Sequence, residues 1–278
     1  MRKLLSANFS RLWRSKIFWI VELGMGLWGL VMFGLVLHNT SEIGESWMQS
    51  NAHIYFFYVL LYIGAVMAVF TSLFIGTEYA DGTICNKLAV GHSRWAVYLA
   101  NLLVVCVASI LFYCTHFLAS LVCIPFVGGK LYSYLAQPLL CFFFGIVIIL
   151  CYGALFTMVA MLDSAKARCA VASLLLSLAL IFGGLMVYGS VTMEETKVQM
   201  VLMEDGSYER QIVPNPRYLT GTKRVIFDCI DACLPGSQGF HVASGEETPD
   251  GKSAICLLGL SCTLTAIGIT LFKKKDIR

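Results

Sequence analysis

Charged residues are scarce in this sequence. They make up 13% of its 278 residues, about half of the share in soluble domains, which is about 25%. Apolar residues make up 58%, and the mean hydropathy is +0.76. So few charges cannot cover a water-soluble surface, so lipid must solvate much of the chain. The net charge of +3 is too small to indicate nucleic acid as a partner.

Motifs for metal and nucleotide binding are also missing. No His-Glu-x-x-His pattern occurs, and the five histidines are scattered over different segments. The nearest approach to a phosphate-binding P-loop is segment 245–253. Five residues separate its two glycines instead of four, and Pro249 lies among them. We therefore expect no catalytic residue, metal or cofactor on this chain, and no ATP bound by it.

Six apolar segments are long enough to cross a bilayer as helices, which takes roughly 20 residues each. They are continuous apolar runs without the two-residue alternation of membrane strands. The predicted spans are 17–37, 54–76, 95–124, 135–162, 168–190 and 254–272. The sequence thus predicts an all-α polytopic membrane protein with six transmembrane helices.

The positions of lysine and arginine set the orientation of these spans. The N-terminal segment, the second and fourth loops and the C-terminal tail together hold thirteen of them. The first and third loops hold one, Lys130. We therefore expect a multi-pass protein of the cell membrane with both termini in the cytoplasm.

Residues 1–16 form a separate N-terminal segment. Leu5, Phe9 and Leu12 recur at helical spacing, while basic residues fall on the other side. This pattern predicts an amphipathic "elbow" helix in the cytosolic headgroup layer. The alternative is a basic flank of the first span that happens to be helical.

Residues 17–190 hold spans one to five, and 254–278 hold span six and a cytosolic tail. Between them, segment 191–253 carries ten acidic residues and four of the six prolines. A structureless loop of this length is uncommon. We expect a small extracellular lobe with strands near 197–203 and 208–213 and a helix near 223–232.

Eleven cysteines are present, and nine of them lie in or beside apolar stretches, where cysteine acts as a small hydrophobe. The other two, Cys229 and Cys233, lie in the predicted extracellular lobe, four residues apart. A helix places them on one face, although a disulfide across one turn is geometrically awkward. The sequence does not decide between a disulfide and a pair of buried thiols.

Span two carries a ladder of small residues, each four positions from the next. These residues are Gly64, Ala68, Ser72 and Gly76. Such a stripe lets another helix approach closely. The pattern does not say whether that helix belongs to this chain or to a second subunit.

The loop 77–94 reads TEYADGTICNKLAVGHSR and is too polar to lie in lipid. It resembles a signature of type-2 ATP-binding-cassette exporter permeases, approximately E-Y-x-x-G-T-I-R-N-K-L-x-x-G-x-S-R directly after the second span. Cys85 departs from the arginine of that signature. The matching residues are Glu78, Tyr79, Gly82, Thr83, Ile84, Asn86, Lys87, Leu88, Gly91, Ser93 and Arg94.

The resemblance implies that 78–94 is a coupling helix seated in a cleft of a separate ATPase subunit. That subunit would bind ATP and Mg. The natural ion-pairing groups of the contact are Glu78, Lys87 and Arg94, and its apolar knobs are Tyr79, Ile84 and Leu88. A second copy of this chain or a sister permease, and membrane lipid, complete the expected partners. The alternative is a solvated loop that only connects two spans.

Two short motifs in the 191–253 segment narrow the resemblance to one branch of this family. Asn215-Pro216-x-Tyr218 and Leu234-Pro235-Gly236 are similar to the bacterial peptide-antibiotic resistance and lantibiotic-immunity branch. This implies an exporter in a bacterial plasma membrane that moves an amphipathic peptide antibiotic or a lipid-like cargo out of the bilayer. The alternatives are a non-transporting membrane sensor of antibiotics and a polytopic lipid-modifying enzyme.

Overall fold

The computed structural model describes residues 1–43, 56–122, 136–202, 208–245 and 249–276. Ten helices and one antiparallel pair of strands occupy these residues. They are α1 (Arg2–Arg14), α2 (Lys16–Ile43), α4 (Val59–Ala80), α5 (Thr83–Ala89), α6 (Arg94–Leu121), α7 (Ala136–Leu162), α8 (Lys166–Val191), β1 (Thr196–Leu202), β2 (Tyr208–Pro214), α9 (Gly221–Cys233), α10 (Pro235–Ser244) and α11 (Gly251–Lys274).

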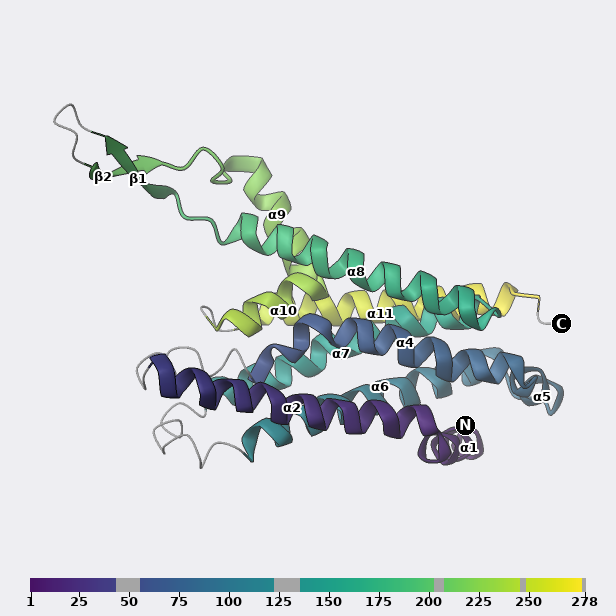
Figure 1. Cartoon of the computed structure of the whole chain (residues 1–278). Coiled ribbons are helices and arrows are strands. Elements are labelled where there is room, and N and C mark those ends of the chain that lie inside the picture. The colour runs from purple at the N-terminus through teal and green to yellow at the C-terminus, as the bar shows by residue number, and fades with distance from the viewer. Residues whose placement is uncertain (44–55, 123–135, 203–207, 246–248, 277–278) are drawn as a thin grey trace.

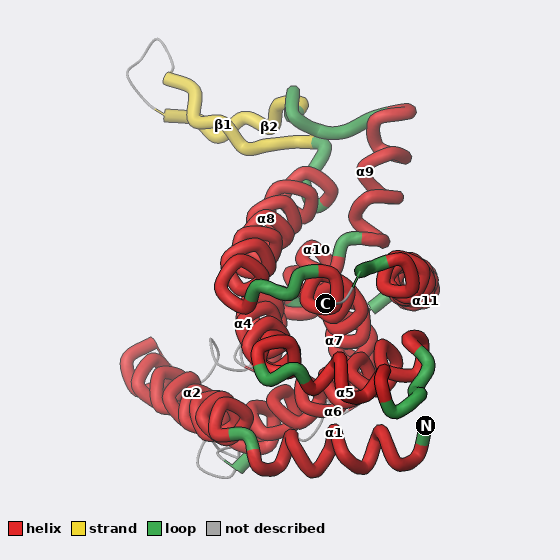
Figure 2. Tube along the Cα trace, turned by 90° about the vertical axis from the view of Figure 1, so that its right-hand side faces the viewer, coloured by secondary structure: helices red, strands yellow, loops and turns green. Residues whose placement is uncertain are grey.

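The long helices lie side by side in an elongated bundle (Figure 1). Both chain termini, α1 and α5 lie at one end of the bundle, which we call the terminal end. The β1–β2 hairpin extends beyond the opposite end, which we call the hairpin end. Viewed from the terminal end, α1 lies across the bundle instead of along it (Figure 2).

Among the described residues, five helices are long and apolar enough to cross a membrane, namely α4, α6, α7, α8 and α11. A sixth span results if α1 and the first part of α2 count as one broken helix, bent by 62°. The break lies at Ser15, whose backbone is extended. The hydroxyl of Ser15 accepts a hydrogen bond from the Phe18 amide at 3.4 Å, as an N-cap residue does.

The predicted spans coincide with these helices to within a few residues at most of the described ends. The clearest differences are at α2, which continues past the predicted end at 37 to Ile43, and at α4, which continues past the predicted end at 76 to Ala80. Residues 54–55, 123–124 and 135 of the predicted spans lie outside the described residues, as does Lys130.

The centre of the bundle consists of α4, α6 and α7. Their spanning windows are 67%, 61% and 56% buried, against 17% for α8 and α11. Aromatic rings fill the space between them and α2, where Phe112 packs 5.0 Å from Phe70 and 5.5 Å from Phe18 between ring centroids. Aromatic packing therefore joins α2, α4 and α6.

The ladder of small residues on α4 faces other helices of this same chain. The Ser72 hydroxyl donates to Ser173 of α8 at 3.1 Å. A Cβ atom added to Gly76 would lie 2.9–3.2 Å from Lys166, also of α8. One added to Gly64 would lie 3.0 Å from the Tyr152 ring of α7 and 3.3 Å from Ser177 Oγ of α8, and Ala68 is fully buried. Small side chains on α4 thus let α8 approach closely.

The segment between α8 and α11 divides into two parts. The strands β1 and β2 and the helix α9 match the predicted positions to within a few residues, with Val198 opposite Ile212 in the ladder. Residue 203 of the first predicted strand lies outside the described residues. The helix α10 is a correction to the single lobe expected from sequence, because it packs into the bundle against α8 and α4.

Glycine makes this docking of α10 possible. A Cβ atom added to Gly236 would lie 2.1 Å from the Leu180 carbonyl oxygen of α8, and one added to Gly239 would lie 3.1 Å from that of Leu60 in α4. Asp231 of α9 then links the two short helices, accepting a hydrogen bond from Gln238 at 3.0 Å. Its partners on α10 outweigh its burial and lower the pKa of Asp231.

The two cysteines of α9 match neither alternative left open by the sequence. Cys229 and Cys233 are both free thiols, and both are exposed. Both expectations were therefore wrong.

Candidate functional site

The signature segment occupies the terminal end of the bundle, where α4, α5 and α6 follow one another. Two glycines make the turns, Gly82 before α5 with φ +66° and Gly91 after it with φ +93°. These left-handed conformations suit glycine because it has no Cβ. Between them α5 is only seven residues long. The predicted coupling helix is therefore shorter than 78–94, and Glu78 and Tyr79 belong to the last turn of α4.

The carboxylate of Glu78 is buried, with 1% of the side chain exposed. Arg11 of α1 and Lys87 of α5 both form ion pairs with its Oε1 atom. Asn101 of α6 donates to Oε2 at 2.8 Å. A buried carboxylate requires such partners because burial removes its hydration. Glu78 therefore joins α4 to α1, α5 and α6.

A fifth residue closes this group. Asn8 of α1, 1% exposed, donates to Asn101 Oδ1 at 2.9 Å and accepts a hydrogen bond from Lys87 Nζ at 2.7 Å. We call Asn8, Arg11, Glu78, Lys87 and Asn101 the Glu78 cluster. One carboxylate here faces two cations. Burial, together with the charge of Arg11, lowers the pKa of Lys87 to about 7.

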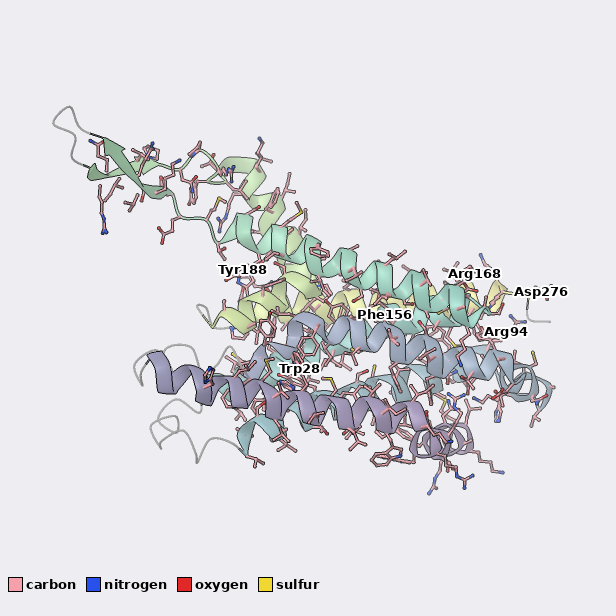
Figure 3. The ribbon with its side chains drawn as sticks, viewed as in Figure 1. Trp28, Arg94, Phe156, Arg168, Tyr188 and Asp276 are labelled. Carbon is pink, nitrogen blue, oxygen red and sulfur yellow. The ribbon has the colours of Figure 1, made fainter. Side chains whose placement is uncertain are left out.

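Tyr79, the residue after Glu78, faces the other side of the bundle. Its hydroxyl donates to the Met161 carbonyl at the end of α7. Arg94 lies close to the C-terminal end of the chain (Figure 3) and donates to the carbonyl oxygens of Phe272 and Lys273 at 3.1 and 3.2 Å. Both side chains therefore connect the segment to α7 and α11.

The apolar side chains of α5 also point into the protein. Ile84 is fully buried, and Leu88 packs against the core. Thr83 donates to the Glu78 carbonyl at 2.9 Å, which holds the first turn of α5 against α4. The inward-pointing side chains, which we call the inner face, are Glu78, Tyr79, Ile84, Lys87, Leu88 and Arg94.

The inner face corrects part of the sequence prediction. Glu78, Lys87 and Arg94 were expected to pair with a partner subunit, but their contacts lie within this chain. The polar sequence of 78–94 predicts a helix separate from the span, with its charged side chains directed toward a partner. The sequence prediction did not include Asn8 and Asn101. The available signal is that each is an amide side chain on an otherwise apolar face of its helix.

The other side of the segment is open. Val90 is 80% exposed and Trp95 is 46% exposed. The exposed residues, which we call the outer face, are Ala80, Asp81, Asn86, Ala89, Val90, Gly91, Ser93 and Trp95. Three of the predicted coupling residues, Asn86, Gly91 and Ser93, are among them. The outer face offers a mixed apolar and polar surface at the terminal end.

Comparison with known proteins identifies the family of the chain. The family model described as ABC-2 family transporter protein matches residues 4–201, from α1 into β1, and so covers both the Glu78 cluster and α5. No curated protein matches the sequence. Since the family match spans well over half of the chain, the chain belongs to the ABC-2 transporter family and is a multi-pass membrane permease of an ABC transporter.

Proposed function

We propose that this permease exports an amphipathic peptide antibiotic or a lipid-like substrate from the bilayer, driven by a separate ATPase subunit that docks on the outer face. Permeases of this family generally work with an ABC ATPase partner. The observation that carries the proposal is the geometry of α5, a short helix held between two spanning helices with one side anchored and the other open.

The outer face has the composition of a protein contact. Val90 and Trp95 supply exposed apolar surface, and Asp81, Asn86 and Ser93 supply polar groups around it. Aromatic and apolar anchors surrounded by polar groups are typical of protein interfaces. A cleft of the ATPase that covers Val90 would remove this apolar surface from water. ATP and Mg would then be bound by the partner.

The inner face provides the route by which movement of α5 reaches the membrane. Lys87 of α5 is tied through Glu78 to α4 and through Asn8 to α1. Asn101 extends the same cluster to α6. Since α4 and α6 are the most buried of the spanning helices, a rigid shift of α5 would be passed to the centre of the bundle.

The topology proposed here places the terminal end in the cytoplasm of a bacterial cell, with six spans counted from α2. The position of α1 across the bundle end supports an interfacial elbow (Figure 2). Trp13 and Trp19 are about half exposed at the junction of α1 and α2, and tryptophan is enriched at membrane interfaces. The hairpin end would then be extracellular.

The low charge of the membrane part supports an apolar or amphipathic cargo. Within the described spanning helices, charged and titratable acidic or basic residues lie near the ends, apart from Glu22 of α2 and the buried His116 of α6. Glu22 accepts a hydrogen bond from Thr115 of α6. An ion or proton pathway would require more such groups. A second copy or a sister permease would complete the pathway.

Affinity purification tests the ATPase contact. The tagged permease is purified from its native membrane, and co-purified ABC ATPase is identified by mass spectrometry. We expect capture by the wild type and its loss in Val90→Glu. The matched control is Val225→Glu on α9, since Val225 is 61% exposed at the hairpin end. Loss of capture in the control but not in Val90→Glu would overturn the docking surface.

Export is tested by antibiotic resistance. Cells that carry the permease and its ATPase should tolerate a higher concentration of a lantibiotic than cells in which the ATPase has lost its catalytic base. Equal resistance in the two strains, with the complex intact, would contradict peptide export. It would instead favour a sensor, which binds the antibiotic without moving it.

A further inference from the structure

The C-terminal end of α11 lies outside the residues matched by the family, yet it contacts the signature segment. Lys275 follows the last residue of α11, and its Nζ atom donates to the Tyr79 hydroxyl at 2.9 Å and to the Met161 carbonyl at 3.1 Å. The same ammonium lies 4.1 Å from the centroid of the Tyr79 ring. Three elements, α4, α7 and α11, thus meet at one side chain.

Lys275 differs from the two lysines that precede it. Lys273 and Lys274 are exposed, whereas Lys275 is half-buried and points into the protein. A basic residue that only satisfied the positive charge expected beside a membrane would remain solvated, as those two do. Lys275 therefore differs from Lys273 and Lys274 both in its burial and in its contacts with Tyr79 and Met161.

Arg94 holds the same end of α11 from the other side. Its guanidinium donates to the carbonyl oxygens of Phe272 and Lys273, and also to that of Lys275. The last carbonyls of a helix have no partner within it and require donors from elsewhere. Arg94 is the first residue of α6, so it joins the end of α11 directly to the turn that follows α5.

We propose that Lys275 is a positioning residue of the coupling site, which together with Arg94 fastens α11 and α7 to the α4–α5–α6 turn. This inference rests on the proposed function, in which the ATPase moves α5. Glu78 and Tyr79 are neighbours on the last turn of α4, and they face opposite sides. A shift of this turn moves the Glu78 cluster through Glu78, and it moves the ends of α7 and α11 through Tyr79.

The network explains how a peripheral helix takes part in the cycle. The spanning window of α11 is 17% buried, and α11 packs mainly along α7 and less against α6. Polar contacts at its end add a fixed connection to the segment that the ATPase moves. Without Lys275, α11 would keep its packing against α7 but lose its link to Tyr79.

Hydrogen–deuterium exchange of the permease–ATPase complex in nanodiscs tests this assignment. Exchange is measured with no nucleotide and after trapping with ATP and vanadate, and the difference is compared between peptides covering 77–94 and 268–276. In the wild type we expect nucleotide to change exchange in both regions. In Lys275→Met the change in 77–94 should persist, while that in 268–276 should fall by at least half.

The controls separate a positioning role from a general loss of structure. Lys274→Met should behave as the wild type, and Lys275→Arg should restore the change in 268–276. Equal changes in both regions for Lys275→Met would overturn the inference while leaving the proposed function intact. If nucleotide changes nothing in 77–94 of the wild-type complex, the proposed function fails and the inference fails with it.

Discussion

The two faces of the segment 78–94 differ in what they contact. The inner face holds the three charged residues that match the signature, Glu78, Lys87 and Arg94. Glu78 contacts Lys87, Arg11 and Asn101, and Arg94 contacts the end of α11. The outer face holds exposed residues, among them Asp81, Asn86 and Val90. One continuous motif therefore contains two sets of residues, one that anchors α5 and one that is exposed.

This difference changes how substitutions in the motif are interpreted. Loss of function after a charge change at Glu78 is expected from a damaged permease, before any partner is involved. Loss of function after a change at Val90 is expected from a lost contact with an intact permease. Measurements of folding and of association therefore distinguish the two faces.

The largest expected effect is at Glu78. Glu78→Gln leaves Arg11 and Lys87 without their carboxylate at a site that is 1% exposed. Breaking a buried ion pair from one side costs about 3–5 kcal/mol. The free energy of unfolding, measured by steric trapping in bicelles, should fall by that amount. Asp81→Asn, an exposed acid three residues further on, should change it by less than about 0.5 kcal/mol.

A smaller effect is expected from the apolar side chains of the two faces. Ile84→Ala removes a fully buried side chain and should destabilise the protein by about 2–4 kcal/mol. Val90→Ala, at an 80% exposed position, should leave stability within about 0.5 kcal/mol but weaken capture of the ATPase. Equal losses of stability in the two variants would remove the distinction between the faces.

The pH dependence of stability tests the environment of Lys87. Its pKa is about 7 in the folded protein, below the ordinary value of 10.5. Between these two values the folded protein binds fewer protons than the unfolded chain, so stability rises with pH from about 7 to 10.5 and is constant below 7. The thermal stability of the wild type in detergent should therefore increase relative to Lys87→Met between pH 7 and 9. A constant difference over that range would show that Lys87 is solvated.

The smallest effects are expected at the two glycine turns. Gly82→Ala and Gly91→Ala place a side chain at positive φ, and no atom lies within 4 Å of the added Cβ. Backbone strain alone then costs about 1 kcal/mol at each site. Gly24→Ala is the control, since its Cβ also has open space but φ is not positive. That variant should be neutral or slightly more stable in the same unfolding measurement.

Hydropathy was sufficient to predict the five described helices that are long and apolar enough to cross a membrane, because the length of an apolar run is set by the membrane thickness. It placed the end of α4 too early, because the sequence becomes polar there. Glu78 is polar and nevertheless buried, since Arg11 pairs with it from a helix about 70 residues earlier and Asn101 donates to it from α6. A local pattern contains no information on such partners.

The hairpin end is a second place where the local sequence pattern does not reveal the tertiary contacts. Pro235, Gly236 and Gly239 are typical of turns, so their sequence did not indicate a helix. In the structure these glycines allow α10 to lie against the backbones of α8 and α4. Lys275 likewise could be recognised only after α4, α7 and α11 were placed together. The motif itself was found from sequence because its residues are adjacent.

Site-specific photocrosslinking tests the central claim, that the outer face binds the ATPase while the inner face does not. A photoreactive amino acid is placed at position 90, at position 84 and, as a control, at position 225, and the permease is irradiated in its native membrane. The account predicts an adduct with the ABC ATPase from position 90 and none from positions 84 and 225. An ATPase adduct from position 84 or 225, with none from position 90, would contradict it.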